Sequence, residues 1–169
     1  EGQPINLEEY DNWLMVRQYR HALDRAVACL AARAHSKHEI EQKLLRVGYR
    51  PCTVEMVLYK LEREHLLNDA DFARQWVEAR SGRKMGRSRI AQELRRKGID
   101  ADEAEEALSA IGEDAQLADA IALAEKAAAR AKSDENPRKT YQRIAAMLAR
   151  RGFRWDITKE ALAQVLQAD

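Results

Sequence analysis

The sequence is poor in the residues that interrupt helices and in those that build disulfide or metal frameworks. Its 169 residues include 7 glycines, 3 prolines and 2 cysteines, and aromatic residues make up only 6%. So few helix breakers permit long uninterrupted helices. The two cysteines, Cys29 and Cys52, are too few for a disulfide framework and are not spaced for zinc, which excludes a disulfide-stapled small domain.

Long apolar runs are also missing. The longest, Ala26–Ala32, has seven residues, whereas a membrane-spanning helix needs about 20. No signal-peptide pattern opens the sequence. We therefore expect a cytoplasmic protein that makes no membrane contact.

Charged residues, in contrast, are abundant at 34% and are segregated along the chain. Residues 69–98 hold nine Lys/Arg against four Asp/Glu, residues 99–119 hold eight Asp/Glu and no Lys/Arg, and residues 120–169 are again basic. Such alternation favours basic faces for an anionic partner, separated by an acidic segment. An ordinary solvated surface would also explain it.

A repeated pattern organises the chain. Two apolar residues four apart are followed four residues later by a glycine and then another apolar residue, at Ile40–Tyr49, Ile90–Ile99 and Ile144–Phe153. The spacing predicts a helix that ends on a left-handed glycine. Amphipathic stretches lie before and after each motif. The prediction is an all-α fold of three tandem three-helix repeats, forming an elongated, curved molecule. We expect a helical N-terminal extension over 1–18 and repeats over 19–67, 68–112 and 113–169.

Helix-start signals agree with this division. Ser36 with Glu39 forms a capping-box pattern. Asn68, Asp100 and Asn136 each precede a predicted helix as N-cap residues, and Pro137 suits the first helical position.

Enzyme signatures are absent from the sequence. It contains no nucleophile elbow, no zinc-protease helix and no dinucleotide fingerprint. His35 and His38 straddle the N-cap Ser36, so a loop separates them and a metal site is not expected. The acidic residues at 100–106 fit a capped helix start better than a catalytic pair. We expect a non-enzymatic protein without cofactor or metal.

The candidate binding residues are basic. They lie in the middle repeat and at the corresponding helix and turn of the third, and they comprise Arg80, Arg83, Lys84, Arg87, Arg89, Arg95, Arg96, Lys97, Arg143, Arg150, Arg151 and Arg154. Gly82 and Gly86 bracket part of this segment, and glycine-rich backbone before a helix can bind phosphate. Aromatic residues do not interleave with these cations as they do in a platform that stacks the bases of a single strand. A flexible loop followed by a solvated helix face remains the alternative.

Two segments carry a family resemblance. Phe72–Arg80 followed by Gly86–Ile99 resembles the central signature of RecX, a bacterial recombination regulator, and Leu23–Ala26 with His35–Ile40 is similar to that family's first unit. The resemblance covers about residues 19–167. It implies a negative modulator of the RecA recombinase, which lies in the groove of the RecA–DNA filament. It also implies inhibition of filament extension, ATP hydrolysis, strand exchange and the LexA coprotease reaction.

Two other functions remain open. The chain could be a helical nucleic-acid-binding module that acts directly on DNA through its basic patches, and a steep salt dependence would reveal this. A helical transcription factor would need a recognition helix, for which 89–97 offers Gln92 and Arg95. For the filament regulator, we expect a monomer whose direct DNA contact is weak or occurs within the filament.

Overall fold

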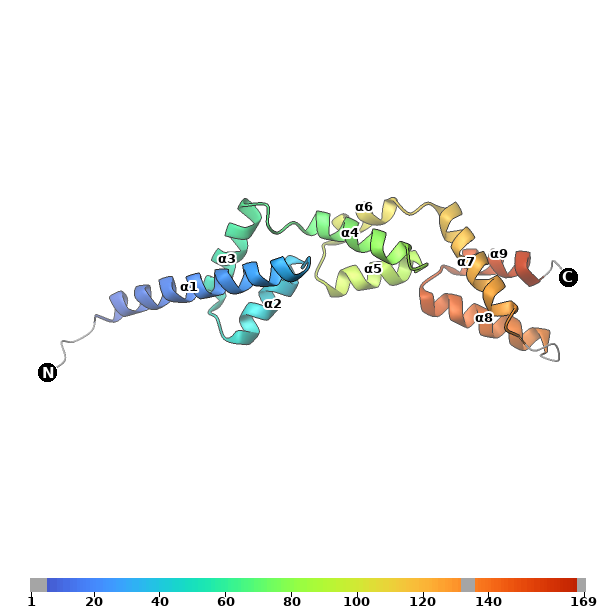
Figure 1. Ribbon diagram of the computed structural model, residues 1–169, viewed down its shortest axis with the longest axis horizontal. Helices are drawn as coiled ribbons and strands as arrows, with labels where there is room; N and C mark the ends of the chain where they lie inside the picture. The colour runs from blue at the N-terminus through green and yellow to red at the C-terminus, as the bar shows by residue number, and fades with distance from the viewer. Residues whose placement is uncertain (1–5, 132–135, 167–169) are drawn as a thin grey trace. The chain divides into compact units, whose positions relative to one another are not determined.

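A computed structural model describes residues 6–131 and 136–166. Over these residues the chain forms nine helices and no strand, so the predicted all-α fold is confirmed (Figure 1). The helices are α1 (Leu7–Ala32), α2 (Lys37–Val47), α3 (Pro51–Arg63), α4 (Asp69–Ser81), α5 (Arg87–Arg96), α6 (Ala101–Ser109), α7 (Glu113–Ala128), α8 (Pro137–Arg151) and α9 (Trp155–Leu166). They follow one another as three tandem three-helix repeats. None of these helices combines the length and the apolar content needed to cross a membrane.

The chain divides into two compact units, the first ending at Phe72 and the second beginning at Ala73. The expected elongation and curvature of the whole molecule, and the repeat boundaries proposed from the sequence, stay predictions.

The repeated glycine ends a helix by the same hydrogen bonds in all three repeats. Gly48, Gly98 and Gly152 have φ values of 98°, 75° and 88°, in the left-handed region. In each turn the amide after the glycine donates to the carbonyl five residues earlier, from Tyr49 to Leu44, Ile99 to Leu94 and Phe153 to Leu148. This is the Schellman pattern, so the prediction from the sequence is confirmed.

The predicted helix starts are also confirmed. Ser36 Oγ accepts from the Glu39 amide at 3.2 Å, and Glu39 Oε2 accepts from the Ser36 amide at 3.3 Å, which completes the capping box. Asn68, Asp100 and Asn136 each accept a hydrogen bond from an amide in the first turn of the following helix.

In the first unit, α1, α2 and α3 pack around one apolar cluster. Its fully buried members include Ile40, Leu44, Val57 and Leu61. Helix α1 is continuous from Leu7, but its fully buried residues, Ala22 and Ala26, lie in its second half. The first half of α1 therefore contributes little to this core.

A buried histidine lies in the loop between α1 and α2. His35 is 4% exposed, and its Nε2 lies 2.7 Å from Lys43 Nζ. An ammonium group can only donate, so Nε2 accepts and Nδ1–H donates to the Arg33 carbonyl at 2.9 Å. Burial lowers the pKa of His35 below 6.5, and the charges of Arg33 and Lys43 lower it further. The neutral ring is therefore part of the folded structure.

The first unit should lose stability as the pH falls below about 6.5. Because the folded-state pKa of His35 is lowered, its contribution is present above the unfolded pKa and is lost as the pH falls through the folded pKa. Urea unfolding of wild type and of His35→Gln at pH 7.5 and 5.5 measures the change in the free energy of unfolding between the two pH values. The wild type should lose more stability than the variant, whereas exposed His21→Gln should behave as wild type. Equal losses in all three chains would contradict the assignment.

Asp69 also has a shifted pKa, but it does not affect the comparison of wild type with the two histidine variants. It accepts a hydrogen bond from the Lys37 amide at 2.8 Å, and burial raises its pKa. Its contribution to stability therefore increases as the pH falls, opposite in sign to that of His35. Asp69 is present in wild type and in both variants, so its contribution to the pH dependence of the unfolding free energy cancels when they are compared.

The second unit contains the rest of α4 and helices α5 to α9. Ile90 and Leu94 of α5 are completely buried, and Leu108 of α6 is nearly so. In the third repeat, Ile144, Leu148 and Leu162 anchor a cluster shared by α7, α8 and α9. The basic residues singled out from the sequence all lie in this unit.

Candidate functional site

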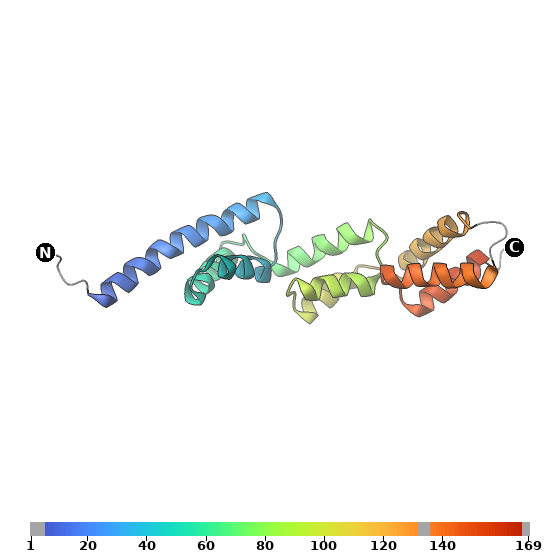
Figure 2. The ribbon, with the colours of Figure 1, turned by 90° about the horizontal axis from the view of Figure 1, so that it is seen from below.

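The turn after α8 packs directly on the start of α5. The Gly86 amide donates to the Arg151 carbonyl at 2.9 Å, and the Ser88 amide donates to the Gly152 carbonyl at 3.2 Å. A Cβ atom on Gly86 would lie 2.2 Å from the Gly152 carbonyl carbon, and one on Gly152 would lie 2.3 Å from Arg89 Cβ. Only glycine at both positions permits this backbone contact. We call this contact the glycine junction; both figures show the end of α8 beside the start of α5 (Figures 1 and 2).

Side chains from the third repeat reinforce the glycine junction. Buried Gln116 accepts a hydrogen bond from the Arg87 amide at 2.9 Å and contacts the Met85 carbonyl at 3.5 Å. Arg151 Nη1 donates to the Arg83 and Lys84 carbonyls at 3.2 and 3.4 Å. Lys84 in turn pairs with Asp119 of α7 at 3.0 Å. These contacts join the loop before α5 to both α7 and α8.

The expectation that the Gly82–Gly86 backbone binds phosphate is therefore wrong. Phosphate sites of that kind need unpaired amides at the helix start. Here the Gly86, Arg87 and Ser88 amides all donate to groups of the third repeat. The glycine at 86 serves close packing between the repeats.

A groove of about 830 Å³ opens beside the glycine junction. Residues from the Arg83–Gln92 segment form one wall, and residues from Met147 to Gly152 form the other. Its cationic side chains are Arg83, Arg89, Arg150 and Arg151. Glycine packing thus brings together two basic segments that are more than 50 residues apart in the sequence. We call this feature the junction groove.

The junction-groove arginines differ in how they are held. Arg83 and Arg150 are exposed, and the described part of the chain offers neither side chain an ion-pair partner. Arg89 Nε lies 3.4 Å from Glu93 Oε1, a weak contact. Arg151 uses one guanidinium nitrogen, Nη1, to donate to the Arg83 and Lys84 carbonyls. Arg83 and Arg150 are therefore the cations best placed to receive an anionic partner.

Glu93 organises the basic residues farther along α5. Its Oε2 accepts from Trp76 Nε1 at 3.1 Å and lies 2.7 Å from Arg80 Nε. The Arg80 N–H is not aligned for a hydrogen bond, so that contact is ionic only. Glu93 is the single acidic residue between Arg80 and Lys97, and it binds the cations around it to the scaffold.

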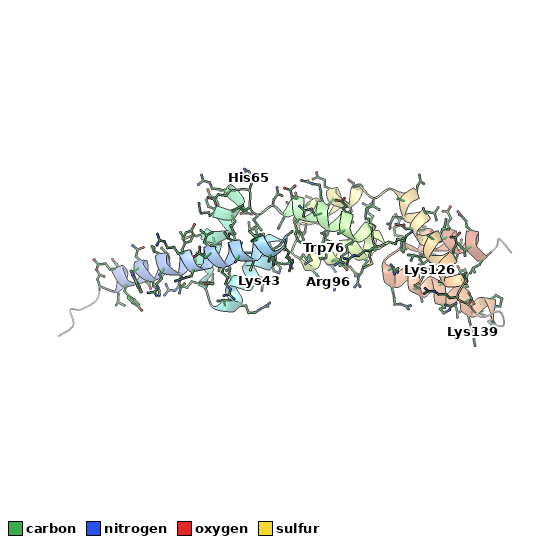
Figure 3. All side chains as sticks on the ribbon, viewed as in Figure 1. Lys43, His65, Trp76, Arg96, Lys126 and Lys139 are labelled. Carbon is green, nitrogen blue, oxygen red and sulfur yellow. The ribbon has the colours of Figure 1, made fainter. Side chains whose placement is uncertain are left out.

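Trp76 of α4, labelled in Figure 3, contacts two of the candidate cations as well as Glu93 of α5. The Arg80 guanidinium and the Lys97 ammonium each lie 4.2 Å from a ring centre of Trp76. These are cation–π distances. One aromatic ring thus contacts the basic segment, because α4 supplies the ring and α5 and its end supply Glu93 and Lys97. A single ring in contact with two cations of the same chain is not a platform that stacks the bases of a single strand.

The remaining candidates lie outside the junction groove. Arg87 pairs with Glu105, and Arg154 pairs with Asp156 at 2.6 Å and Glu113 at 3.6 Å. Arg95 and Arg96 are exposed at the end of α5, with Arg96 Nε 3.4 Å from its own helix at the Gln92 carbonyl. Arg143 is exposed on α8. The structure thus assembles four of the twelve candidates in one groove and leaves eight elsewhere.

Sequence reasoning missed Gln116, Glu93 and the glycine junction. Gln116 is 4% exposed although glutamine usually lies at the surface, and nothing in its sequence context sets it apart. Among the described residues, no group of three or more His, Cys, Asp or Glu side chains is arranged to hold a metal ion. The site is defined by cations.

The fold and the site together define a class: a tandem three-helix protein whose second and third repeats share a basic groove. Comparisons identify the family. Residues 22–61, 68–108 and 114–162 match the first, second and third three-helix domains of RecX. The chain therefore belongs to the RecX family of regulatory proteins, and a regulatory role linked to RecA is implied by that family.

Individual relatives agree with this assignment. The chain is 36% identical over 148 residues to the regulatory protein RecX of Prosthecochloris aestuarii, covering 87% of this chain and 95% of the relative. It is 38% identical over 150 residues to that of Halorhodospira halophila, covering 86% and 89%. The crystal structure of RecX from Lactobacillus salivarius superposes with a TM-score of 0.81 at 26% identity, covering 89% of this chain and 97% of that one.

Proposed function

We propose that this chain binds the RecA filament on DNA and inhibits filament extension, ATP hydrolysis, strand exchange and coprotease activity. The observation that carries the proposal is the junction groove, in which Arg83 and Arg150 face solvent without a counter-ion among the described residues. A recombinase filament presents DNA phosphates and carboxylate side chains, and guanidinium groups recognise both through paired hydrogen bonds. The proposal places this activity in the cytoplasm.

The glycine junction suits the groove to this task. Two loops that moved independently would lose conformational freedom on binding, which weakens affinity. Here the backbone hydrogen bonds of Gly86 and Ser88 hold the two walls together before any partner arrives. The binding surface is therefore preorganised within the second unit.

The direct test is the ATPase of RecA assembled on single-stranded DNA, titrated with this chain. Inhibition is expected, and inhibition at well below one chain per recombinase would indicate that the chain blocks filament ends. Undiminished ATPase at a molar excess of the chain would contradict the proposal.

The exposed turn at the end of α5 supplies a second arm of this test. Reversing Arg95, Arg96 and Lys97 together would also remove the Lys97 contact with Trp76. The double variant Arg95→Glu/Arg96→Glu leaves that contact in place. If the turn contacts the filament, this variant should keep its helicity and no longer inhibit the RecA ATPase. Full inhibition by the variant would restrict the interface to the junction groove.

Direct binding to DNA without a recombinase is the second candidate, and the same counter-ion-free arginines favour it. Affinity for single- and double-stranded DNA over a salt series discriminates between the two, because phosphate neutralisation gives a steep dependence of log K on log salt. Tight, salt-sensitive binding to bare DNA would favour the direct module. Weak binding together with ATPase inhibition would favour the filament regulator.

A further inference from the structure

Helix α3 carries an exposed apolar stripe on the side away from the core of the first unit. Its core-facing residues include Val57 and Leu61, which are completely buried. Opposite them lie Cys52, Met56 and Tyr59, whose i, i+4 and i+7 spacing places them on one side of the helix. Met56 is 46% exposed and Tyr59 is 61% exposed. The core of the first unit therefore does not account for this stripe.

The other two repeats have polar or small residues at the same positions. The repeats align on the glycine before the helix, so the residues four, eight and eleven positions after that glycine are equivalent. These residues are Asp102, Glu106 and Ser109 in the second repeat, and Asp156, Glu160 and Ala163 in the third. A three-helix repeat thus folds without the stripe, which belongs to the first repeat alone.

The stripe lines a groove of about 750 Å³ between α2 and α3. Leu45 of α2 and Pro51 at the start of α3 extend its apolar lining towards the turn at Gly48. The Arg63 guanidinium lies 5.8 Å from the Tyr59 ring centre and lines a separate hollow towards α1. We call the larger feature the α2–α3 groove.

The charges in the α2–α3 groove are mostly negative. The carboxylates of Glu41, Glu55 and Glu62 line it, together with the single ammonium group of Lys37. Lys37 pairs with Glu62 at 2.7 Å, and Glu41 lies 3.5 Å from His38. Glu55 is exposed and has no ion partner among the residues that the structure describes. The groove therefore combines apolar surface with an excess of negative charge.

We propose that the α2–α3 groove binds a basic amphipathic helix of a partner protein. Apolar residues at i and i+4 of that helix would pack on Leu45, Met56 and Tyr59, and lysine or arginine residues beside them would face Glu41 and Glu55. Roughly 11 residues of α3 at 1.5 Å per residue give a groove about 16 Å long, which fits about three helical turns. A nucleic-acid partner is disfavoured, because the carboxylates repel phosphate.

A second copy of the chain does not offer such a helix. The strongly basic helices among those described are α5 and α8, and their apolar residues Ile90, Leu94, Ile144 and Leu148 are completely buried. The start of α1 is exposed, but its first turn is acidic, so the carboxylates of the groove repel it. The occupant is therefore a different protein. The α2–α3 groove shares no residue with the junction groove, so this proposal goes beyond RecA binding and holds or fails independently of it.

NMR titration of the full chain with three synthetic helical peptides tests the proposal. The first peptide carries leucine at i and i+4 and lysine on both flanks, the second has glutamate for each lysine, and the third has alanine for each leucine. Only the lysine–leucine peptide should shift the amide signals of the α2–α3 groove, with a dissociation constant on the order of 100 µM because a short peptide must be ordered on binding. The signals are followed residue by residue, because the junction-groove arginines attract the glutamate peptide. No shift in the α2–α3 groove at about 1 mM lysine–leucine peptide, or equal shifts with all three peptides, would overturn the proposal.

Two variants separate the apolar and the charged parts of the α2–α3 groove. Met56→Gln/Tyr59→Gln should weaken binding of the lysine–leucine peptide at least about tenfold, because it removes the apolar contact area. Glu55→Lys should weaken it about three- to tenfold, as expected for a surface ion pair replaced by repulsion. All three residues are exposed, so circular dichroism should show unchanged helicity in both variants.

The matched control is Asp24→Lys, which makes the same change in charge at an exposed position of α1 in the same unit. It should bind the lysine–leucine peptide as wild type does. Equal losses in Glu55→Lys and Asp24→Lys would mean that net charge acts in place of the groove, and full binding by Met56→Gln/Tyr59→Gln would refute the docking surface.

Discussion

Replacing Gly152 with alanine should destabilise the second unit by roughly 2–5 kcal/mol and separate the two walls of the junction groove. Two costs combine in this estimate. An L-residue at the Gly152 φ of 88° costs roughly 1–2 kcal/mol. The added methyl group would lie 2.3 Å from Arg89 Cβ and 2.4 Å from the Arg89 amide nitrogen, and overpacking of that kind costs roughly 1–3 kcal/mol more.

Two other glycines separate these costs. Gly48 ends α2 with φ 98°, but an added Cβ would meet nothing within 4 Å, so Gly48→Ala should show only the conformational cost. Gly86 has φ −72°, yet its Cβ would lie 2.2 Å from Gly152, so Gly86→Ala should show only the steric cost.

Urea unfolding measures the free energy of unfolding of the three variants. Hydrogen exchange at the Gly86 and Ser88 amides reports on the glycine junction itself. Exchange at those amides should accelerate in Gly152→Ala and Gly86→Ala and stay unchanged in Gly48→Ala. If Gly48→Ala cost as much as Gly152→Ala, close packing at the glycine junction would not be the cause.

Reversing the two counter-ion-free junction-groove arginines should have the largest effect on activity. The variant Arg83→Glu/Arg150→Glu should inhibit the RecA ATPase at least roughly 100-fold less well, because each lost charged hydrogen bond costs about 1.5–3 kcal/mol and tenfold corresponds to about 1.4 kcal/mol. Stability should change little, since neither side chain has an ion partner among the described residues. Inhibition curves and thermal unfolding of the same preparations measure both quantities.

The matched control makes the same change in net charge, on the helix that carries Arg150. Arg138→Glu/Lys139→Glu reverses two exposed cations at the other end of α8. It should inhibit as well as wild type does. Equal losses in the two double variants would mean that net charge acts in place of the junction groove, and normal inhibition by Arg83→Glu/Arg150→Glu would remove the groove from the interface.

Much of the fold was predictable because its signals are local. The glycine that ends each of α2, α5 and α8 lies four residues after a buried leucine, and a helix needs a left-handed residue there to satisfy its last carbonyls. The capping box at Ser36 likewise involves only residues three apart. Hydrogen bonds within one turn of chain depend on sequence alone.

The candidate site was predictable only in part. The sequence indicated a basic middle repeat and a basic third repeat, but charge content does not show which cations pair within the chain. Arg87 and Arg154 find acidic partners on other helices, and Glu93 retains Arg80. The phosphate-binding role expected for the Gly82–Gly86 backbone was wrong, because the amides at the start of α5 are already paired: those of Gly86 and Ser88 donate to carbonyls about 65 residues away, and that of Arg87 donates to the Gln116 side chain.

The amino-acid sequence by itself determined the helices, their ends, the threefold repeat and the excess of cations in the last two repeats, since each follows from periodicity and short-range hydrogen bonding. Tertiary structure alone decided which of the helix-ending glycines also packs against another helix. Gly48 and Gly152 share one motif and one backbone conformation, yet only Gly152 lies against another helix. That contact joins Arg83 to Arg150 in one groove, because close packing depends on what the rest of the chain brings alongside.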